Sequence, residues 1–123
     1  MRAPGTDWVY KILPWSDWEA LDGADEWAGS EADLRAGFIR FSTAAQVAET
    51  ARLHFAGAGA LALLGVPANQ VALTWEPSRG GEPSPHLYGP LPLDVIDVIE
   101  RVAIGPEGHE FPWWLSLGYP PTD

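Results

Sequence analysis

The stretch Gly37-Phe38-Ile39-Arg40-Phe41-Ser42-Thr43-Ala44-Ala45-Gln46 joins a short apolar segment directly to the start of a helix. Phe38 to Phe41 has the aromatic and β-branched content of a strand, with one cation, Arg40, inside it. Thr43 is followed three residues later by Gln46, a spacing that is typical of a capping box at a helix N-terminus. The stretch therefore predicts a strand that passes into a helix with almost no loop between them.

Such a strand-to-helix junction is able to bind an anion. The first N–H groups of a helix point outward at the positive end of its dipole, and the hydroxyls of Ser42 and Thr43 stand beside them. The everyday alternative is that both side chains only cap a structural helix, which is the common use of these residue types. The sequence leaves both interpretations open.

Length and composition predict a single domain over residues 1–123. The chain is 46% hydrophobic and 20% charged, which suffices for one core that buries roughly two-thirds of the surface of the unfolded chain. We expect the core to span about residues 8–104. The remaining residues, 105–123, form a tail rich in aromatic side chains.

The formal net charge of −10 disfavours duplex nucleic acid and anionic membrane as main partners, because the interaction with their phosphates would be repulsive over most of the surface. Acidic residues are concentrated between Asp17 and Asp33, a segment that we expect to be a solvated face. There is no cysteine, which excludes disulfides, thiolate catalysis and cysteine-ligated metals. No stretch resembles a signal peptide or a membrane span of ~20 apolar residues, so a cytoplasmic location is expected.

The rest of the chain predicts short strands and helices in an α+β arrangement. Alternation in the first strand places Val9, Lys11 and Leu13 on one face, and Lys11 is the unexpected residue there. Strands are predicted over residues 8–13, 38–41, 61–66, 73–76 and about 95–104, with a strand-like piece at 85–90. Helices are predicted over residues 17–21 with Ser16 as cap, from 30 to 37, and from 43 to about 56. We expect a mainly antiparallel, split sheet with short helices packed on it.

The longest predicted helix carries a narrow stripe of mostly small residues for packing on the sheet: Ala44, Val47, Ala48, Ala51 and Phe55. His54 lies off this stripe, which favours a surface or boundary position. Residues 77–85 are rich in Gly, Pro and Ser and predict a loop.

Four short motifs, in this order, resemble those of the bacterial domain-of-unknown-function family nine-five-two. They are Tyr10-Lys11-Ile12, residues 37–43 with Gln46, Trp75-Glu76, and Pro85-His86-Leu87-Tyr88-Gly89-Pro90-Leu91. The resemblance extends over about residues 8–102. That family looks like a compact relative of the ADP-ribosyltransferases and of the NAD-using RNA 2′-phosphotransferases. The resemblance therefore implies an ADP-ribosylation-like fold with a cleft between two half-sheets.

The resemblance also implies roles for individual residues. Lys11 matches a basic or histidine position that faces the nucleotide, and Phe41-Ser42-Thr43 matches the segment that opens the helix. Family members generally carry His where Lys11 and Arg40 stand, and the Gln/Glu-x-Glu pattern of many transferases is absent here. Lys and Arg supply fixed positive charge for a phosphate, but they do not exchange protons near neutral pH as histidine does.

The predicted site joins these residues to two titratable side chains later in the chain. The candidate catalytic residues are Glu76 and His86. The candidate ligand-binding residues are Lys11, Arg40, Ser42, Thr43 and Tyr88, of which Tyr88 shares a strand face with His86. We expect Lys11, Arg40, Ser42, Thr43 and His86 to line one cleft, and we expect no metal site. The alternatives are that the two cations protect strand edges and that Glu76 is an ordinary strand-end carboxylate.

Three functions remain open from the sequence. The first is an enzyme of the ADP-ribosyltransferase type that uses NAD, and the second is a binding module on the same fold without the chemistry. Both would take a small nucleotide or another phosphate-bearing ligand. The third is a protein-interaction domain that acts through the aromatic tail. The chain is expected to be a monomer or a homodimer, since the tail can be buried against its own sheet or against a second subunit.

Overall fold

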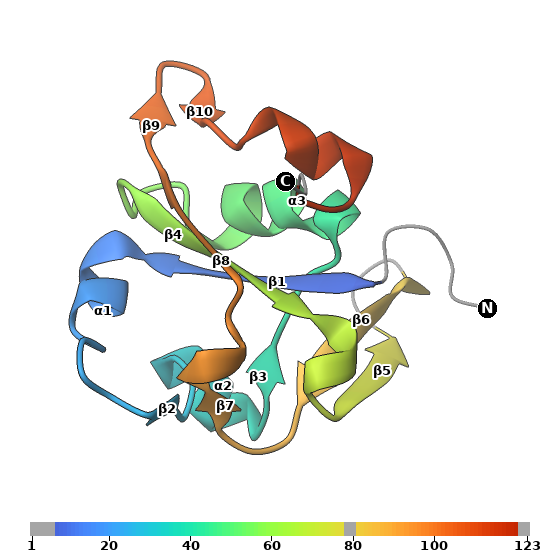
Figure 1. Cartoon of the computed structure of the whole chain (residues 1–123). Coiled ribbons are helices and arrows are strands. Elements are labelled where there is room, and N and C mark those ends of the chain that lie inside the picture. The colour runs from blue at the N-terminus through green and yellow to red at the C-terminus, as the bar shows by residue number, and fades with distance from the viewer. Residues whose placement is uncertain (1–6, 78–80, 121–123) are drawn as a thin grey trace.

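Two three-stranded antiparallel sheets form the framework of the computed structural model, which describes residues 7–77 and 81–120 (Figure 1). The first sheet has the order β1 (Trp8–Pro14), β4 (Leu61–Pro67), β8 (Val98–Val102), and the second has the order β3 (Ile39–Arg40), β6 (Pro83–Leu87), β5 (Leu73–Pro77). Two short antiparallel pairs join β2 (Glu26–Trp27) to β7 (Leu91–Pro92) and β9 (Ile104–Gly105) to β10 (Gly108–His109). The expected mainly antiparallel α+β architecture is confirmed.

The two sheets meet at an isolated antiparallel bridge between Tyr10 and Ser42. The amide of Tyr10 donates to the carbonyl of Ser42 at 2.8 Å, and the amide of Ser42 donates back to Tyr10 at 2.7 Å. The bridge follows directly after β3, so the sequence stretch that ends in the helix cap is also the point where the half-sheets are joined.

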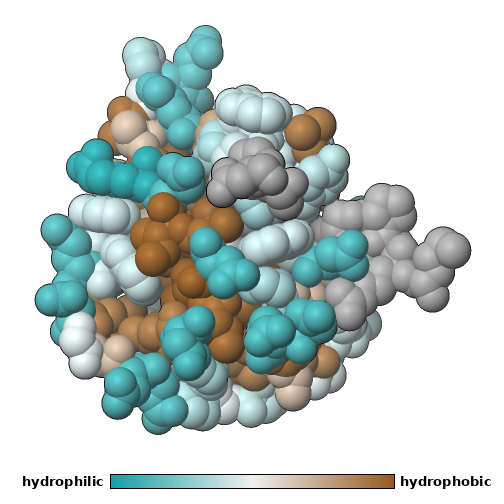
Figure 2. Space-filling view, in the orientation of Figure 1, coloured by the Kyte–Doolittle hydropathy of each residue, from teal (hydrophilic) through white to brown (hydrophobic). Residues whose placement is uncertain are grey.

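The first sheet lies between separate apolar clusters. β4 is its central strand, and Leu61 to Leu64 are fully buried. Tyr10 and Ile12 face one cluster, whereas Val9 and Leu13 belong to two others, which confirms the predicted alternation in β1. Figure 2 shows apolar side chains gathered in the middle of one face, where β8 crosses the front of the molecule in Figure 1, with hydrophilic groups around them.

Short helices surround these sheets. They are α1 (Trp15–Glu19), α2 (Glu31–Ala36), α3 (Ala44–His54) and the 3-10 helices η1 (Ala68–Gln70), η3 (Leu93–Val95) and η4 (Trp113–Leu117). α3 packs its predicted small-residue stripe onto β1 and β4 through Ala44, Val47 and Ala51. Ala48 is exposed, and His54 is exposed as expected. No helix among the described residues is long and apolar enough to cross a membrane.

Several element boundaries differ from the prediction, and three of the differences are large. α1 begins at Trp15, directly after Pro14, and Ser16 lies inside the helix instead of capping it. The predicted strand 95–104 is divided among η3, β8 and β9, since the amide of Ile96 turns back to Leu93 and pairing with β4 begins only at Val98. β6 begins at Pro83, inside the predicted loop, because residues 83–87 pair with β5. Residues 78–80 of that loop lie outside the described residues.

The aromatic tail is buried only in part. η4 lays Trp114 and Leu115 against the cluster formed by β1, β4 and α3, where they are 5% and 7% exposed. The neighbouring Trp113 is 71% exposed, and Leu117 and Tyr119 are exposed as well. The neighbouring indoles of Trp113 and Trp114 therefore point in different directions from the same 3-10 helix. The buried indole, Trp114, packs within its own chain.

Replacement of Trp114 by Ala should therefore destabilise the protein far more than replacement of Trp113. Removal of a buried indole costs about 3–5 kcal/mol of unfolding free energy, whereas removal of the exposed one should cost a small fraction of that. Urea unfolding of W114A and W113A, followed by circular dichroism, compares two neighbouring residues of the same type. Equal losses in both variants would contradict this account of the tail.

Candidate functional site

The second sheet has one apolar and one polar face. Ile39, Leu73 and Leu87 point into the cluster that contains Val9 and Val66. Residues that alternate with them point the other way. In the register of the sheet, Arg40 and Thr74 both lie directly opposite His86. Side chains directly opposite each other on antiparallel strands share a face, so these three form one row across the polar face.

A hydrogen-bonded group of three side chains lies on this polar face. Oε1 of Glu76 lies 2.7 Å from Nδ1 of His86 and accepts a hydrogen bond of 2.6 Å from the hydroxyl of Tyr88. The ring of Phe38 stacks on the His86 imidazole, with centroids 4.0 Å apart and planes at 22°. Phe38 also contacts the Tyr88 ring and lies under the guanidinium of Arg40. Two strands and the entry to β3 therefore hold one imidazole in a defined orientation.

The other nitrogen of that imidazole is unsatisfied. His86 is 5% exposed, and its Nε2 is buried with no hydrogen-bond partner among the described residues. Most buried polar side-chain atoms in native proteins have a partner, and an unsatisfied one costs about 1–3 kcal/mol. This nitrogen is the strongest indication of a function in the structure.

The hydrogen bonds also shift two pKa values. The hydroxyl of Tyr88, and after it His86, stabilise the ionised carboxylate and lower the pKa of Glu76 below its ordinary 4.5. The same bond raises the pKa of Tyr88, since its hydroxyl donates to a carboxylate. Glu76 is therefore ionised at neutral pH.

A buried ion pair fixes the backbone of Arg40. Nζ of Lys11 lies 2.8 Å from Oδ2 of Asp33, and the two side chains are 9% and 6% exposed. Lys11 also donates to the carbonyl of Arg40 at 2.8 Å, and the amide of Arg40 donates to Oδ1 of Asp33 at 3.3 Å. Burial lowers the pKa of Lys11, an effect that Asp33 opposes. The side chain of Arg40 is exposed.

Two adjoining hollows, called here the polar cleft, lie beside these groups. One, of about 680 Å³, is lined by Phe38, Ser84, His86 and one side of α3. The other, of about 560 Å³, is lined by Lys11, Asp33 and Arg35. Both are lined by Arg40, Ser42, Thr50 and His54. Within residues 7–77 and 81–120, no group of three or more His, Asp and Glu side chains is placed to hold a metal ion.

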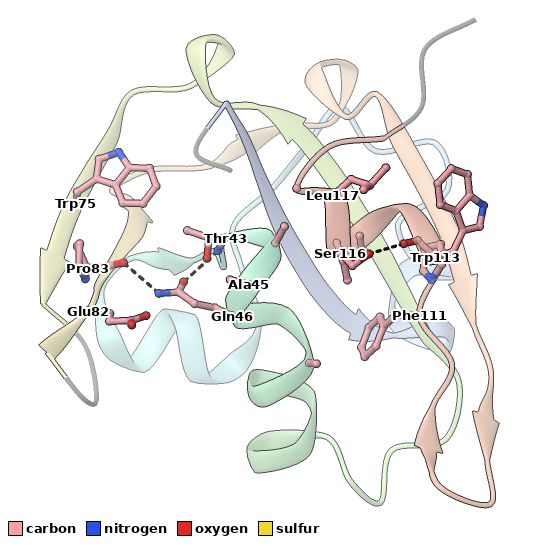
Figure 3. A pocket seen from close by; sticks show the side chains of 15 residues that line it. Thr43, Ala45, Gln46, Trp75, Glu82, Pro83, Phe111, Trp113, Ser116 and Leu117 are labelled. Atoms are coloured by element: carbon pink, nitrogen blue, oxygen red, sulfur yellow. Dashed lines mark hydrogen bonds between the residues drawn. The ribbon is translucent and has the colours of Figure 1, made fainter. Parts of the chain in front are cut away.

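A third hollow, the apolar groove of Figure 3, lies on the other side of Gln46. It measures about 1040 Å³ and runs from Trp75 across the start of α3 to the tail. Gln46 separates it from the polar cleft, since its amide donates to the carbonyl of Pro83 at 3.1 Å and its Oε1 accepts from the amide of Thr43 at 3.0 Å. Thr43 therefore heads α3 with the predicted capping-box partner and lines this groove.

The predicted site residues therefore do not all line the same hollow. Lys11, Arg40, Ser42 and His86 line the polar cleft, whereas Thr43 lines the apolar groove. Glu76 stands next to His86, and Tyr88 is 55% exposed.

Three residues that line the polar cleft were not predicted as site residues from the sequence: Phe38, Asp33 and His54. The alternation Phe38-x-Arg40 was a visible signal, because it places both side chains on one face of a strand. The partner of Lys11 was not visible, because Asp33 follows Ser30 by three residues, a spacing that is typical of a helix capping box. Asp33 does hold that cap, with Ser30, in addition to its ion pair.

Comparison with known proteins gives the family. The family model "Protein of unknown function (DUF952)" matches residues 12–99. The chain belongs to this family. The crystal structure of protein CC0527 from Caulobacter crescentus is similar, with 36% identity, a TM-score of 0.83, and coverage of 89% of this chain and 99% of that one. The solution NMR structure of CC0527 gives 37% identity, a TM-score of 0.75, and coverage of 85% and 91%. No curated protein matches this DUF952 chain.

Replacement of Asp33 by Ala should strongly destabilise this DUF952 protein. The change leaves the ammonium of Lys11 buried without its counter-ion and the amide of Arg40 without its acceptor, a loss of about 3–5 kcal/mol. The matched control is Glu31→Ala in the same helix, because that carboxylate is exposed and its ion pair with Arg35 is worth at most about 1 kcal/mol. Chemical unfolding measures the free energy of unfolding of both variants. A loss in D33A no larger than that in E31A would refute the structural role of the Lys11–Asp33 pair.

Replacement of Tyr88 by Phe should raise the pKa of Glu76 toward 4.5. A carboxyl whose folded pKa is lowered adds stability above its unfolded pKa and loses it as the pH falls through the folded value. The unfolding free energy of the unaltered protein should therefore fall more steeply below about pH 4.5 than that of Y88F. Carbon-13 NMR titration of the Glu76 carboxyl measures the pKa directly, with Tyr119→Phe as control. An unchanged titration in Y88F would contradict the hydrogen-bond assignment.

Proposed function

We propose that the polar cleft binds a small phosphate-bearing ligand of the nucleotide class, with NAD as a candidate. The observation that supports this proposal best is the buried, unpartnered Nε2 of His86 at a hollow that Arg40 also lines. A hydroxyl of the ligand supplies the missing donor to Nε2, and the guanidinium of Arg40 supplies the charge that pairs with the phosphate.

Arg40 is the residue to which we assign the phosphate. Its backbone is fixed at both the amide and the carbonyl, whereas its side chain is exposed at the junction of the two hollows. A planar guanidinium donates two parallel hydrogen bonds to a phosphate. The start of α3, at Ala45, lines the same hollow and adds the positive end of a helix dipole, whereas Ser42, which also lines it, is hydrogen-bonded to Thr50.

The other binding residues take supporting parts. Lys11 already gives hydrogen bonds to Asp33 and to the carbonyl of Arg40, so we assign it to the floor of the cleft. Thr43 contributes only as the residue that caps the start of α3. Tyr88 presents a half-exposed ring next to Phe38, on which a flat base is able to stack.

ADP-ribosyl transfer is the second candidate function. The motif resemblance to an ADP-ribosylation-like fold and the split sheet with a cleft at its junction favour it. In this activity, Glu76 and His86 would assist the cleavage of NAD. Release of nicotinamide from NAD by the pure protein tests the activity, and binding of NAD without release would identify a binding module instead.

Replacement of Arg40 by Ala should weaken binding about ten-fold or more, because a hydrogen bond to a charged group is worth about 1.5–3 kcal/mol. Calorimetric titration with NAD, ADP-ribose and inorganic phosphate measures the affinity. Arg101→Ala is the control, since Arg101 lies on β8 against Trp15, away from the cleft lining. No heat with any of the three compounds at millimolar concentration would refute the proposal.

A further inference from the structure

We infer that His86 acts as a general base, whose Nε2 accepts a proton from a hydroxyl of the bound phosphate ester. The inference rests on the proposed function, because it takes the ligand from there. It goes further by naming the reacting atom and the class of substrate: a phosphodiester with a free hydroxyl on the neighbouring carbon.

The tautomer of His86 follows from its partner. Glu76 is ionised at neutral pH and has only acceptors to offer, so the imidazole nitrogen that lies 2.7 Å from it carries the hydrogen. In the neutral ring the lone pair is then on Nε2. The nitrogen without a partner is thus the one that is able to accept a proton.

Three neighbours hold this ring and do not themselves take the proton. Oε1 of Glu76 accepts from Tyr88 and from His86, which makes Glu76 a positioning residue that stabilises the imidazolium once it forms. Tyr88 fixes the carboxylate, and Phe38 fixes the plane of the ring by stacking.

Access of a substrate hydroxyl to Nε2 requires local movement of the groups around it. Nε2 is covered in the ligand-free protein. Phe38, which is half-buried, lies on the ring, and the exposed Arg40 lies over Phe38. Recruitment of Arg40 to a phosphate draws its guanidinium away from Phe38 and loosens the packing around His86, and we assign the exposure of Nε2 to this loosening.

The reaction balances without a further reactant. The ligand O–H bond breaks, its proton goes to Nε2, and the oxygen forms a bond to phosphorus. The bond from phosphorus to the leaving alcohol breaks on the opposite side of phosphorus, where the leaving oxygen takes a proton from water, and the imidazolium then gives its proton back to the solvent. The products are a cyclic phosphate and an alcohol. Arg40, in the same row as His86, stabilises the charge that develops on the phosphate oxygens.

The first test measures the release of p-nitrophenol from uridine 3′-(p-nitrophenyl phosphate), which has the neighbouring hydroxyl. Thymidine 3′-(p-nitrophenyl phosphate), which lacks it, is the matched compound. We expect release from the uridine compound alone, and a fall of about 100-fold or more in kcat for His86→Gln. His109→Gln is the control, because that imidazole bonds to Gly59 away from the cleft lining. Equal rates for both compounds, or an unchanged rate in H86Q, would overturn the inference.

The second test does not depend on activity or on a folded variant. Long-range nitrogen-15 NMR of the unaltered protein should show His86 with a protonated Nδ1 and an unprotonated Nε2, and the Nε2 signal should move when uridine 3′-phosphate is added. A proton on Nε2 in the ligand-free protein at neutral pH would overturn the inference. Binding of this nucleotide without release from the diester refutes the general base but leaves the proposed function standing. Failure of the nucleotide to bind overturns the inference, whereas the proposed function is refuted only when NAD, ADP-ribose and inorganic phosphate also fail to bind.

Glu76→Gln separates positioning from a merely structural role. The loss of the anionic acceptor should lower kcat while KM stays the same, and it should produce a mixture of the two imidazole tautomers in the nitrogen-15 spectrum. An E76Q variant with unchanged kcat and an unchanged tautomer would show that Glu76 does not position the ring.

Discussion

The buried pair of Lys11 and Asp33 is the interaction on which the rest of the structure depends, because it holds three elements at one place. Lys11 comes from β1, Asp33 from α2, and their shared target is the backbone of Arg40 in β3. Desolvation offsets much of the attraction between two buried charges, so such a pair adds little net stability. Its effect here is geometric: it satisfies both backbone groups of Arg40 at the edge where the two half-sheets meet.

The register of the second sheet places Arg40 and His86 side by side. Arg40 pairs with His86, and His86 in turn pairs with Thr74, two residues before Glu76. A shift of one residue in this register would turn every side chain to the opposite face and bring Leu87 into the cleft in place of His86. The pairing of β5 with β6 brings Glu76 to His86, and the contact that Lys11 makes with the backbone of Arg40 adds a fixed cation to the same face.

Local signals in the sequence predicted most of the elements. The alternation in β1, the apolar run of β4 and the capping pairs of α2 and α3 each depend on residues within one element. The predictions that failed concern features that depend on partners far along the chain. The start of α1 was missed because the helix begins directly after β1 ends at Pro14. The sequence also does not distinguish Trp113 from Trp114, of which η4 buries only Trp114.

The predicted site illustrates the same division. Sequence patterns identified which side chains were unusual, such as a cation inside an apolar strand or a histidine next to a proline. They did not identify which of these side chains already had a partner. Lys11 has a carboxylate and a carbonyl within hydrogen-bonding distance, whereas Nε2 of His86 is equally buried and has none among the described residues. A buried polar group that is satisfied within the fold is explained by the fold, and one that is not calls for a partner outside the chain, such as a ligand or a water, or for a role in a reaction. By that criterion Lys11 belongs to the framework, whereas His86 is the residue for which we propose a chemical role, although the sequence pattern marked both as unusual.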